Sequence, residues 1–199
     1  MCSEDNCHSS WFLITSLLEY NEVFGVTKTT QVIVIVIGLP GSGKSYFARR
    51  LATRLRAEHI NSDTVRKAMG ASGRYSFKEK LVVYTEMARM TEKFLDENKV
   101  VVVDATFYHH LMRDIFLQLA HQQSVRICFI QVRAKEGLIQ ERLSIPRDDS
   151  EADFKVYQDI RDQFQEIMIP HLELDSTNEN ITQMLDTAVE YVNSNHERK

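Results

Sequence analysis

The segment Gly38-Leu39-Pro40-Gly41-Ser42-Gly43-Lys44-Ser45 constrains the fold of this chain more than any other. It matches the pattern G-x4-G-K-[ST] at every fixed position, and three of the chain's seven glycines fall within it. It also stands in the required context, because it follows the β-branched run QVIVIVI (31–37) and precedes a stretch of helical periodicity. The backbone N–H groups of such a turn form a concave anion site, which side chains at the glycines would block. The segment therefore predicts a site for nucleotide phosphates.

The residue types within the turn indicate how it would hold a nucleotide. Lys44 places a point charge near the β- and γ-phosphates, and the Ser45 hydroxyl is a ligand for Mg²⁺. We therefore expect ATP or GTP and Mg²⁺ as cofactors. The predicted nucleotide-binding residues are Gly38, Gly41, Ser42, Gly43, Lys44 and Ser45. This pattern predicts nucleotide binding and leaves the reaction open.

Strand and helix patterns alternate after residue 30, which predicts βαβ units and a parallel sheet covered by helices on both faces. At 199 residues, the chain has the length of one domain. We expect an N-terminal extension over 1–30 and an α/β domain over 31–199, with a small lid near 134–152. The expected strands are 31–37, 59–61, 99–103, 125–132 and 172–174. The expected helices are 44–58, one with Ser62 or Asp63 as its N-cap, 75–98, 110–122, 135–143, 153–168 and 178–193.

Charge, hydropathy and cysteine usage exclude several classes. The longest apolar runs, 32–37 and 100–103, are far shorter than the ~18 residues of a membrane helix. Three cysteines, an odd number, favour a reducing cytoplasm over a disulfide framework. The net charge is −4, yet residues 44–80 hold ten basic and three acidic residues. That segment either faces phosphates or consists of solvated helix faces, and charge alone does not decide between them.

Three further segments accompany the phosphate-binding turn. They are Asn61-Ser62-Asp63-Thr64-Val65-Arg66-Lys67, then VVVDATF over 101–107, then a stretch from 133 to 147 that contains Arg142 and Arg147. With this order of motifs, the sequence over 31–177 resembles the P-loop kinases grouped around the kinase domain of phage-type polynucleotide kinase. Zeta toxins and chloramphenicol phosphotransferase are wider relatives of that group.

The resemblance implies a P-loop NTPase fold with a five-stranded parallel sheet in the order 2-3-1-4-5. It also implies that Asp63 lies over the acceptor hydroxyl and that Arg66 contacts an acceptor-side phosphate. Arg142 and Arg147 would close on the donor phosphates, and Asp104 would take the Walker B position beside the metal. Two positions depart from the family pattern: Tyr46 stands where Thr is common, and Pro146 would stiffen the lid.

The residues themselves leave alternatives open. Asp63 is either a carboxylate that orients a hydroxyl for attack or a plain helix N-cap. Asp104 follows four valines, where a buried carboxylate is costly unless it meets a metal or hydrogen-bond donors.

The sequence thus favours a kinase whose acceptor is a nucleic-acid 5′-OH or a small-molecule hydroxyl. A regulatory ATPase without a phosphorylated acceptor is the alternative, although such a switch has no need of the Asp63 and Arg66 pair. Nothing in the sequence indicates an oligomeric state.

Overall fold

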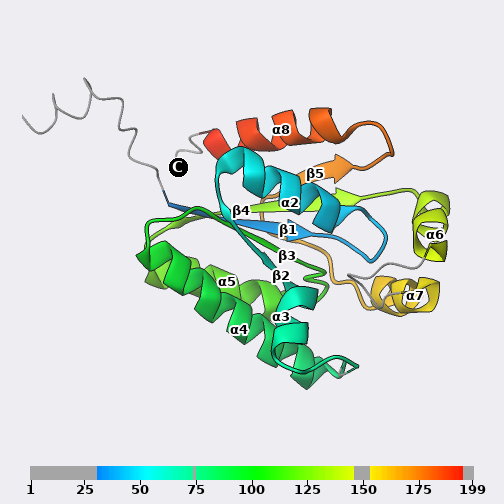
Figure 1. Ribbon diagram of the computed structural model, residues 1–199, viewed down its shortest axis with the longest axis horizontal. Coiled ribbons are helices and arrows are strands. Elements are labelled where there is room, and N and C mark those ends of the chain that lie inside the picture. The colour runs from blue at the N-terminus through cyan, green and yellow to red at the C-terminus, as the bar shows by residue number, and fades with distance from the viewer. Residues whose placement is uncertain (1–30, 74, 146–152, 195–199) are drawn as a thin grey trace, which may run out of the picture. The chain divides into compact units, whose positions relative to one another are not determined.

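The computed structural model describes residues 31–73, 75–145 and 153–194 (Figure 1). The predicted extension over 1–30, Arg147 and the lid segment 146–152 lie outside these described residues. Within them, helices cover both faces of a central sheet, as the alternating pattern predicts. None of the described helices combines the length and apolar character needed to cross a bilayer.

The described residues form a five-stranded, all-parallel sheet in the order β2-β3-β1-β4-β5. The strands are β1 (Val32–Ile37), β2 (Glu58–Asn61), β3 (Val101–Ala105), β4 (Arg126–Arg133) and β5 (Leu172–Asp175). Every residue of β1 is buried, which explains why a run of valine and isoleucine occupies the middle strand. The observed order confirms the predicted order 2-3-1-4-5 and the P-loop NTPase fold.

Two hydrophobic cores lie on opposite faces of the sheet. Ile33, Ile35 and Ile37 face one core, together with side chains of α4 (Phe77–Asp96) and α5 (His110–Gln122). The alternate valines of β1 face the other core, against α2 (Lys44–Leu55) and α8 (Ile181–Asn193). This period of two follows from the pleat of the strand, so one short run anchors helices on both sides.

The remaining described helices lie near the carboxyl ends of the strands. The short helix α3 (Ser62–Ala68) follows β2 directly. Helices α6 (Glu136–Ser144) and α7 (Phe154–Asp162) stand beyond that edge of the sheet (Figure 1). An ion pair of 2.8 Å between Arg161 and Glu136 joins α7 to α6. In open α/β sheets, this edge is where ligands bind.

The helix expected over 153–168 ends earlier, at Asp162. Beyond it, the backbone N–H of Gln165 donates to the carbonyl of Tyr108 at 2.8 Å. The guanidinium of Arg113 donates to the carbonyls of Gln165 and Glu166 at 3.1 and 3.0 Å. A continued helix would have needed the N–H of Gln165, which bonds Tyr108 instead, so tertiary contacts override the local periodicity.

The helix expected over 44–58 is also shorter and ends at Leu55. Its C-cap, Arg56, adopts a left-handed conformation with φ of 52°, and its N–H satisfies carbonyls of the last turn. The chain then reverses and enters β2 at Glu58. The prediction was wrong here because no glycine or proline marks the end of this helix.

Candidate active site

The phosphate loop, residues 38–45, connects β1 to α2 at the carboxyl edge of the sheet. Gly43 is the N-cap of α2 and has φ of 90°, where only glycine is free of strain. A Cβ on Gly43 would lie 2.9 Å from the Ser176 hydroxyl, and one on Gly38 would lie 2.6 Å from the Val132 carbonyl oxygen. Both glycines are therefore required by the close packing of the loop.

The other predicted nucleotide-binding residues lie where the pattern placed them. Gly41 is in the turn with φ of 78°, and the N–H of Ser42 donates to the carbonyl of Leu39 at 3.1 Å. Lys44 and Ser45 open α2 and line a cleft of about 1040 Å³. The loop thus presents a helix N-terminus, a lysine and a hydroxyl to one cavity, which is the geometry of an anion site.

Asp104 is fully buried near the end of β3 and pairs in register with Val36 and Asn61. Its Oδ2 accepts a hydrogen bond from Nδ2 of Asn61 at 2.6 Å and lies 3.6 Å from Nε2 of His59. Its Oδ1 has no hydrogen-bond partner among the described residues. A buried carboxylate oxygen without a donor is costly, which suits a position that meets a cation.

The surroundings of Asp104 favour the charged carboxylate. Burial raises its pKa, but His59, the ammonium of Lys44, and the side chains of Asn61 and Ser45 outweigh burial and hold that pKa below its ordinary value. Ser45 is among the groups that lower the pKa of Asp104, so its hydroxyl belongs to the surroundings of this carboxylate. Mg²⁺ is commonly held by one or two protein oxygens together with phosphate oxygens and water, so these two residues fit that ion.

Asp63 lies in the first turn of α3 and lines the same cleft. The prediction that Ser62 or Asp63 caps this helix was wrong, because Asn61 is the N-cap. The Asn61 side chain accepts from the N–H groups of Asp63 and Thr64, each at 3.0 Å. Because the capping role belongs to Asn61, it does not account for the carboxylate of Asp63.

Two cations line the cleft beside Asp63. Arg66, one turn further along α3, is 6% exposed, and its guanidinium lies 4.8 Å from the ring centroid of Tyr75. Lys80 of α4 donates to the hydroxyl of Tyr108 at 3.4 Å, and its ammonium is 4.6 Å from that ring's centroid. Both cations are cleft-lining residues. They make this side of the cleft positive as well as the phosphate-loop side.

Arg142, near the end of α6, lies against the phosphate loop. Its guanidinium donates to the carbonyl of Ser42 at 3.2 Å and to the hydroxyl of Ser176 at 3.1 Å. It also donates to the carbonyl of Thr177 and the side chain of Asn178, at 3.0 and 3.1 Å. Arg142 therefore ties the phosphate loop to the loop between β5 and α8. Arg147, its predicted companion, lies outside the described residues.

The loop between β5 and α8 both precedes a helix and borders the cleft. Thr177 and Asn180 cap each other's backbone N–H groups at 3.2 and 2.9 Å ahead of α8. Ser176, Thr177 and Asn178 also line the cleft. The same loop thus begins the helix and lies beside Arg142 and the phosphate loop.

Sequence reasoning missed the partners of Asp104. His59 and Asn61 belong to β2, and the pairing of β2 with β3 brings them beside Asp104. Asn61 precedes α3 and has the residue type of an N-cap, which is the signal that identifies it. His59 had no local signal, because its role depends on which strand lies next to β2.

The profile of a family described as an AAA domain (AAA_33) matches residues 33–167. Similar solved structures include the Mycobacterium tuberculosis APS kinase CysC in complex with AMPPNP and APS. It is 16% identical, has a TM-score of 0.67, and the match covers 83% of this chain and 99% of that one. Chaetomium thermophilum Kti12 in complex with ADP-AlF3 is 19% identical, with a TM-score of 0.61 and coverage of 81% and 100%. A gluconokinase from Sinorhizobium meliloti 1021 is 15% identical, with a TM-score of 0.61 and coverage of 80% and 90%.

At these identities, the similar structures establish the fold. The family match reaches further, because it spans more than half of the chain and contains the phosphate loop, Asp63, Arg66 and Asp104. The chain therefore belongs to this AAA-domain family of P-loop proteins.

Proposed function

We propose that this protein is a Mg²⁺-dependent P-loop kinase that transfers the γ-phosphoryl group of ATP or GTP to a hydroxyl acceptor. The observation that carries the proposal is that Asp63 and Arg66 line the same cleft as the phosphate loop. Two similar structures are named as kinases, and two hold nucleotides, AMPPNP and ADP-AlF3. These names support a nucleotide donor and an acceptor that receives its phosphoryl group.

On the donor side, the backbone N–H groups of the loop and of the first turn of α2 bind the phosphates. Lys44 neutralises charge at the β- and γ-phosphates, where negative charge is concentrated during transfer. Ser45 and Asp104 would hold Mg²⁺, which supplies further charge stabilisation to the same phosphates when bound. Arg142 keeps the phosphate loop and the β5–α8 loop together around the nucleotide.

On the acceptor side, Asp63 orients the hydroxyl and accepts its proton. The acceptor oxygen forms a bond to the γ-phosphorus while the bond from that phosphorus to the β–γ bridging oxygen breaks. The nucleoside diphosphate leaves, and the proton moves to the carboxylate of Asp63. A positioned acid–base group of this kind contributes about 10²- to 10⁴-fold to the rate. Arg66 holds the acceptor, and Arg147 remains the predicted second arginine of the lid.

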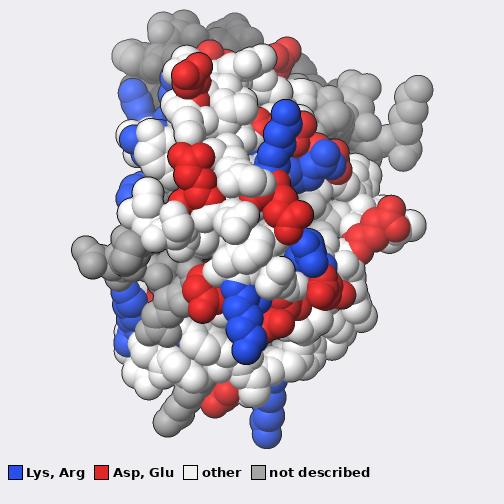
Figure 2. Space-filling model, turned by 90° about the vertical axis from the view of Figure 1, so that its right-hand side faces the viewer, with Lys and Arg blue, Asp and Glu red and all other residues white. Residues whose placement is uncertain are grey.

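The acceptor is a nucleic-acid 5′-OH or a small-molecule alcohol, and membership of the polynucleotide-kinase-like group is part of this proposal. Figure 2 shows the face formed by α6 and α7 at the sheet edge, where acidic and basic side chains are interspersed. Arg161 of α7 pairs with Glu136 of α6, and Arg133 of β4 pairs with Glu173 of β5. A polynucleotide track needs a continuous basic stripe, so the α6–α7 face favours a small alcohol.

The rival function is a regulatory ATPase, and one experiment separates it from the kinase. The full chain is incubated with γ-labelled ATP, Mg²⁺ and a panel of nucleosides, sugars, aminoglycoside-like alcohols and 5′-OH oligonucleotides. The kinase proposal expects label on at least one acceptor, and Asp63→Asn should abolish most of that transfer. Hydrolysis that releases labelled phosphate at the same rate with every acceptor, and in Asp63→Asn, would instead establish the regulatory ATPase.

A further inference from the structure

The edge strand β2, which lies next to β3 in Figure 1, places two polar side chains beside Asp104. His59 and Asn61 are separated by the buried Ile60, and residues two apart on a strand point to the same face of the sheet. In register, Asn61 pairs with Asp104, and His59 pairs with Val102 of the same strand. Because paired residues of neighbouring strands share a face, both side chains reach the carboxylate of Asp104.

The two oxygens of the Asp104 carboxylate have unequal surroundings. Oδ2 accepts from Nδ2 of Asn61 at 2.6 Å and lies 3.6 Å from Nε2 of His59. That nitrogen is buried and has no hydrogen-bond partner among the described residues, and the same holds for Oδ1 of Asp104. The 3.6 Å separation is longer than a formed hydrogen bond, and hydrogen bonds in active sites commonly tighten when substrates bind. Oδ2 is therefore the oxygen that β2 holds, and Oδ1 is the oxygen left for a ligand.

The amide of Asn61 also connects this carboxylate to α3. Its Oδ1 accepts from the N–H groups of Asp63 and Thr64, each at 3.0 Å, while its Nδ2 donates to Asp104. The opposite assignment of the amide would turn its NH₂ group toward two N–H donors and its oxygen toward a carboxylate oxygen. The partners of Asn61 thus determine its orientation, and one side chain ties Asp104 to the helix that carries Asp63.

We propose that Asn61 and His59 are positioning residues, which hold Oδ2 of Asp104 and leave Oδ1 for Mg²⁺, so that β2 sets the affinity of the site for this cation. The inference rests on the proposed function and adds the residues that orient its cation ligand. A carboxylate that is held through one oxygen presents the other with little further loss of side-chain freedom. Loss of such an outer partner typically weakens metal binding by about 10- to 100-fold.

The first test measures how far Mg²⁺ and nucleotide strengthen each other's binding, without any need for turnover. AMPPNP is titrated into the full chain by calorimetry at pH 8, once with EDTA and then at a series of Mg²⁺ concentrations. In Asn61→Ser, the Mg²⁺ dissociation constant of the AMPPNP complex should rise about 10- to 100-fold, because serine keeps a helix cap but is too short to donate to Asp104. AMPPNP affinity in EDTA should stay within about twofold of wild type, since the phosphate loop is untouched.

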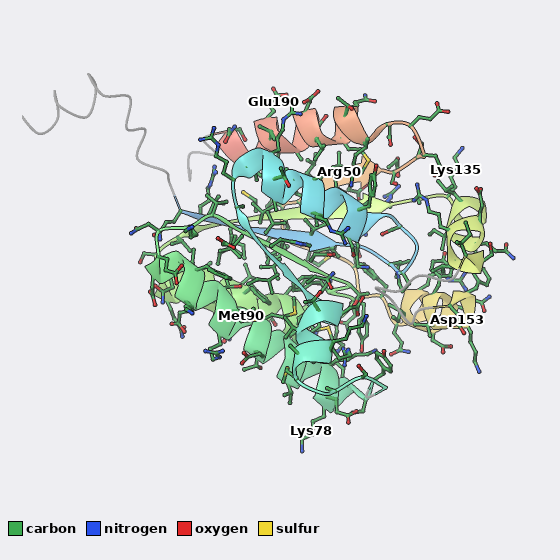
Figure 3. All side chains as sticks on the ribbon, in the orientation of Figure 1. Arg50, Lys78, Met90, Lys135, Asp153 and Glu190 are labelled. Atoms are coloured by element: carbon green, nitrogen blue, oxygen red, sulfur yellow. The ribbon has the colours of Figure 1, made fainter. Side chains whose placement is uncertain are left out.

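Matched variants separate cation positioning from a general loss of structure. Asn193→Ser makes the same exchange at an exposed position of α8 and should change Mg²⁺ affinity less than about twofold. Asp104→Asn removes the cation ligand itself and gives the upper limit of the effect. Its control is Glu190→Gln, which removes one negative charge from the outer side of α8 (Figure 3). Mg²⁺ affinity equal to that of wild type in a folded Asn61→Ser variant, with its urea unfolding midpoint unchanged, would overturn the proposal.

His59 is tested by a pair of variants, which also decide the proposal where Asn61→Ser does not fold. His59→Leu removes the donor, so Mg²⁺ affinity should fall about tenfold, whereas His59→Gln offers an amide N–H and should stay within about threefold of wild type. His121→Leu, at an exposed position of α5, is the matched control. Unchanged Mg²⁺ affinity in His59→Leu would overturn the proposal. An equal loss in both variants would also contradict it, because the imidazole would then have a role other than donation.

The second test uses transfer from γ-labelled ATP and separates this inference from the kinase proposal. With an acceptor that becomes labelled, Asn61→Ser should need about 10- to 100-fold more Mg²⁺ for its half-maximal rate, and its rate at saturating Mg²⁺ should recover to within about fivefold of wild type. A rate that stays low at saturating Mg²⁺ would contradict a positioning role toward the cation. If no acceptor becomes labelled, the kinase proposal fails and the AMPPNP titrations still decide this inference. If wild type binds AMPPNP equally well in EDTA and in Mg²⁺, the inference fails even where an acceptor is labelled.

Discussion

The two ends of the cleft are built in different ways. The proposed donor end is a backbone structure made from eight consecutive residues, 38–45, in which glycines allow the loop to pack closely against its neighbours. The acceptor end is a side-chain structure, assembled from Asp63 and Arg66 of α3, Lys80 of α4 and Tyr108 of the β3–α5 loop. A backbone site recognises what all nucleoside triphosphates share. A side-chain site changes with single substitutions, and we therefore expect specificity to lie at the acceptor end.

The largest effect on phosphoryl transfer is expected from Asp63→Asn, which should change the acceptor end of the cleft and leave the donor end intact. Asp63→Asn should lower phosphoryl transfer about 10²- to 10⁴-fold, because the hydroxyl loses its proton acceptor. Nucleotide affinity should stay within about twofold, since the phosphate loop is untouched. Transfer rates with a labelled acceptor and equilibrium binding of AMPPNP measure the two quantities. Asp162→Asn, an exposed carboxylate paired with Arg161, is the control. A variant at Asp63 that loses both quantities together would show that the ends of the cleft are not independent.

The local sequence was sufficient to predict the shape of the donor end but not that of the acceptor end, and the reason is physical. The phosphate loop lies within eight residues, so one pattern contains all of its geometry. Asp63 and Arg66 were placed in the cleft by a resemblance that keeps their spacing of three residues. The pairing of Lys80 with Tyr108 spans 28 residues and two elements, and only the packing of α4 against the β3–α5 loop creates it.

The elements of the fold show the same difference: some were predictable from local sequence, and others depend on tertiary contacts. The buried strands β1, β3 and β4 were predicted because a sheet covered on both faces demands continuous apolar runs. The end of α7 was not predicted, because Arg113 and Tyr108 bind the backbone beyond Asp162 across more than 50 residues of sequence. Asn61 was overlooked as the N-cap for a different reason, since Ser62 and Asp63 are also good caps and the choice depends on where β2 ends.

The next largest effect tests the donor end at Lys44. Lys44→Ala should reduce transfer on the order of 10²-fold or more, because it removes the preorganised charge at the β- and γ-phosphates. Unlike Asp63→Asn, it should also weaken nucleotide binding, which is measured by titration with AMPPNP. Arg50→Ala is a suitable control, because Arg50 is an exposed cation on the same helix and stacks on the ring of Tyr46. Wild-type turnover in Lys44→Ala would contradict the assignment of the phosphate loop.

A smaller effect should come from Arg142, where a side chain supports the backbone site. Arg142→Lys keeps the charge but loses the planar fork that bonds the phosphate loop and the β5–α8 loop together. We expect nucleotide affinity to fall about tenfold, with the acceptor KM unchanged within about twofold. Steady-state kinetics with each substrate varied in turn gives both numbers. A larger change in the acceptor KM than in the nucleotide KM would place Arg142 at the acceptor end instead.

The smallest effect on turnover concerns the support beneath the acceptor end. The hydroxyl of Tyr84 accepts the N–H of Phe107, which has a left-handed backbone, and lies 3.3 Å from the hydroxyl of Thr106. Tyr84→Phe leaves a buried N–H without its partner, so the free energy of unfolding should fall by about 1–3 kcal/mol. Turnover at 25 °C should change only a few-fold, because no acceptor-side cation is removed. Urea unfolding at pH 8 measures the loss, with Tyr46→Phe, at an exposed position, as the control.

The same substitution has a defined pH signature. Burial raises the pKa of Tyr84 to about 12, outweighing the hydrogen bonds with Thr106 and Phe107, which lower it. The phenol of the unfolded chain ionises near pH 10. A pKa that is higher in the folded state gives stability that is complete below pH 10 and is lost as the pH rises toward 12. The stability difference between wild type and Tyr84→Phe should therefore stay constant from pH 7 to 9 and shrink between pH 10 and 12. A constant difference up to pH 12 would mean that the Tyr84 hydroxyl is accessible to water, and that the acceptor end is less rigidly supported than the donor end.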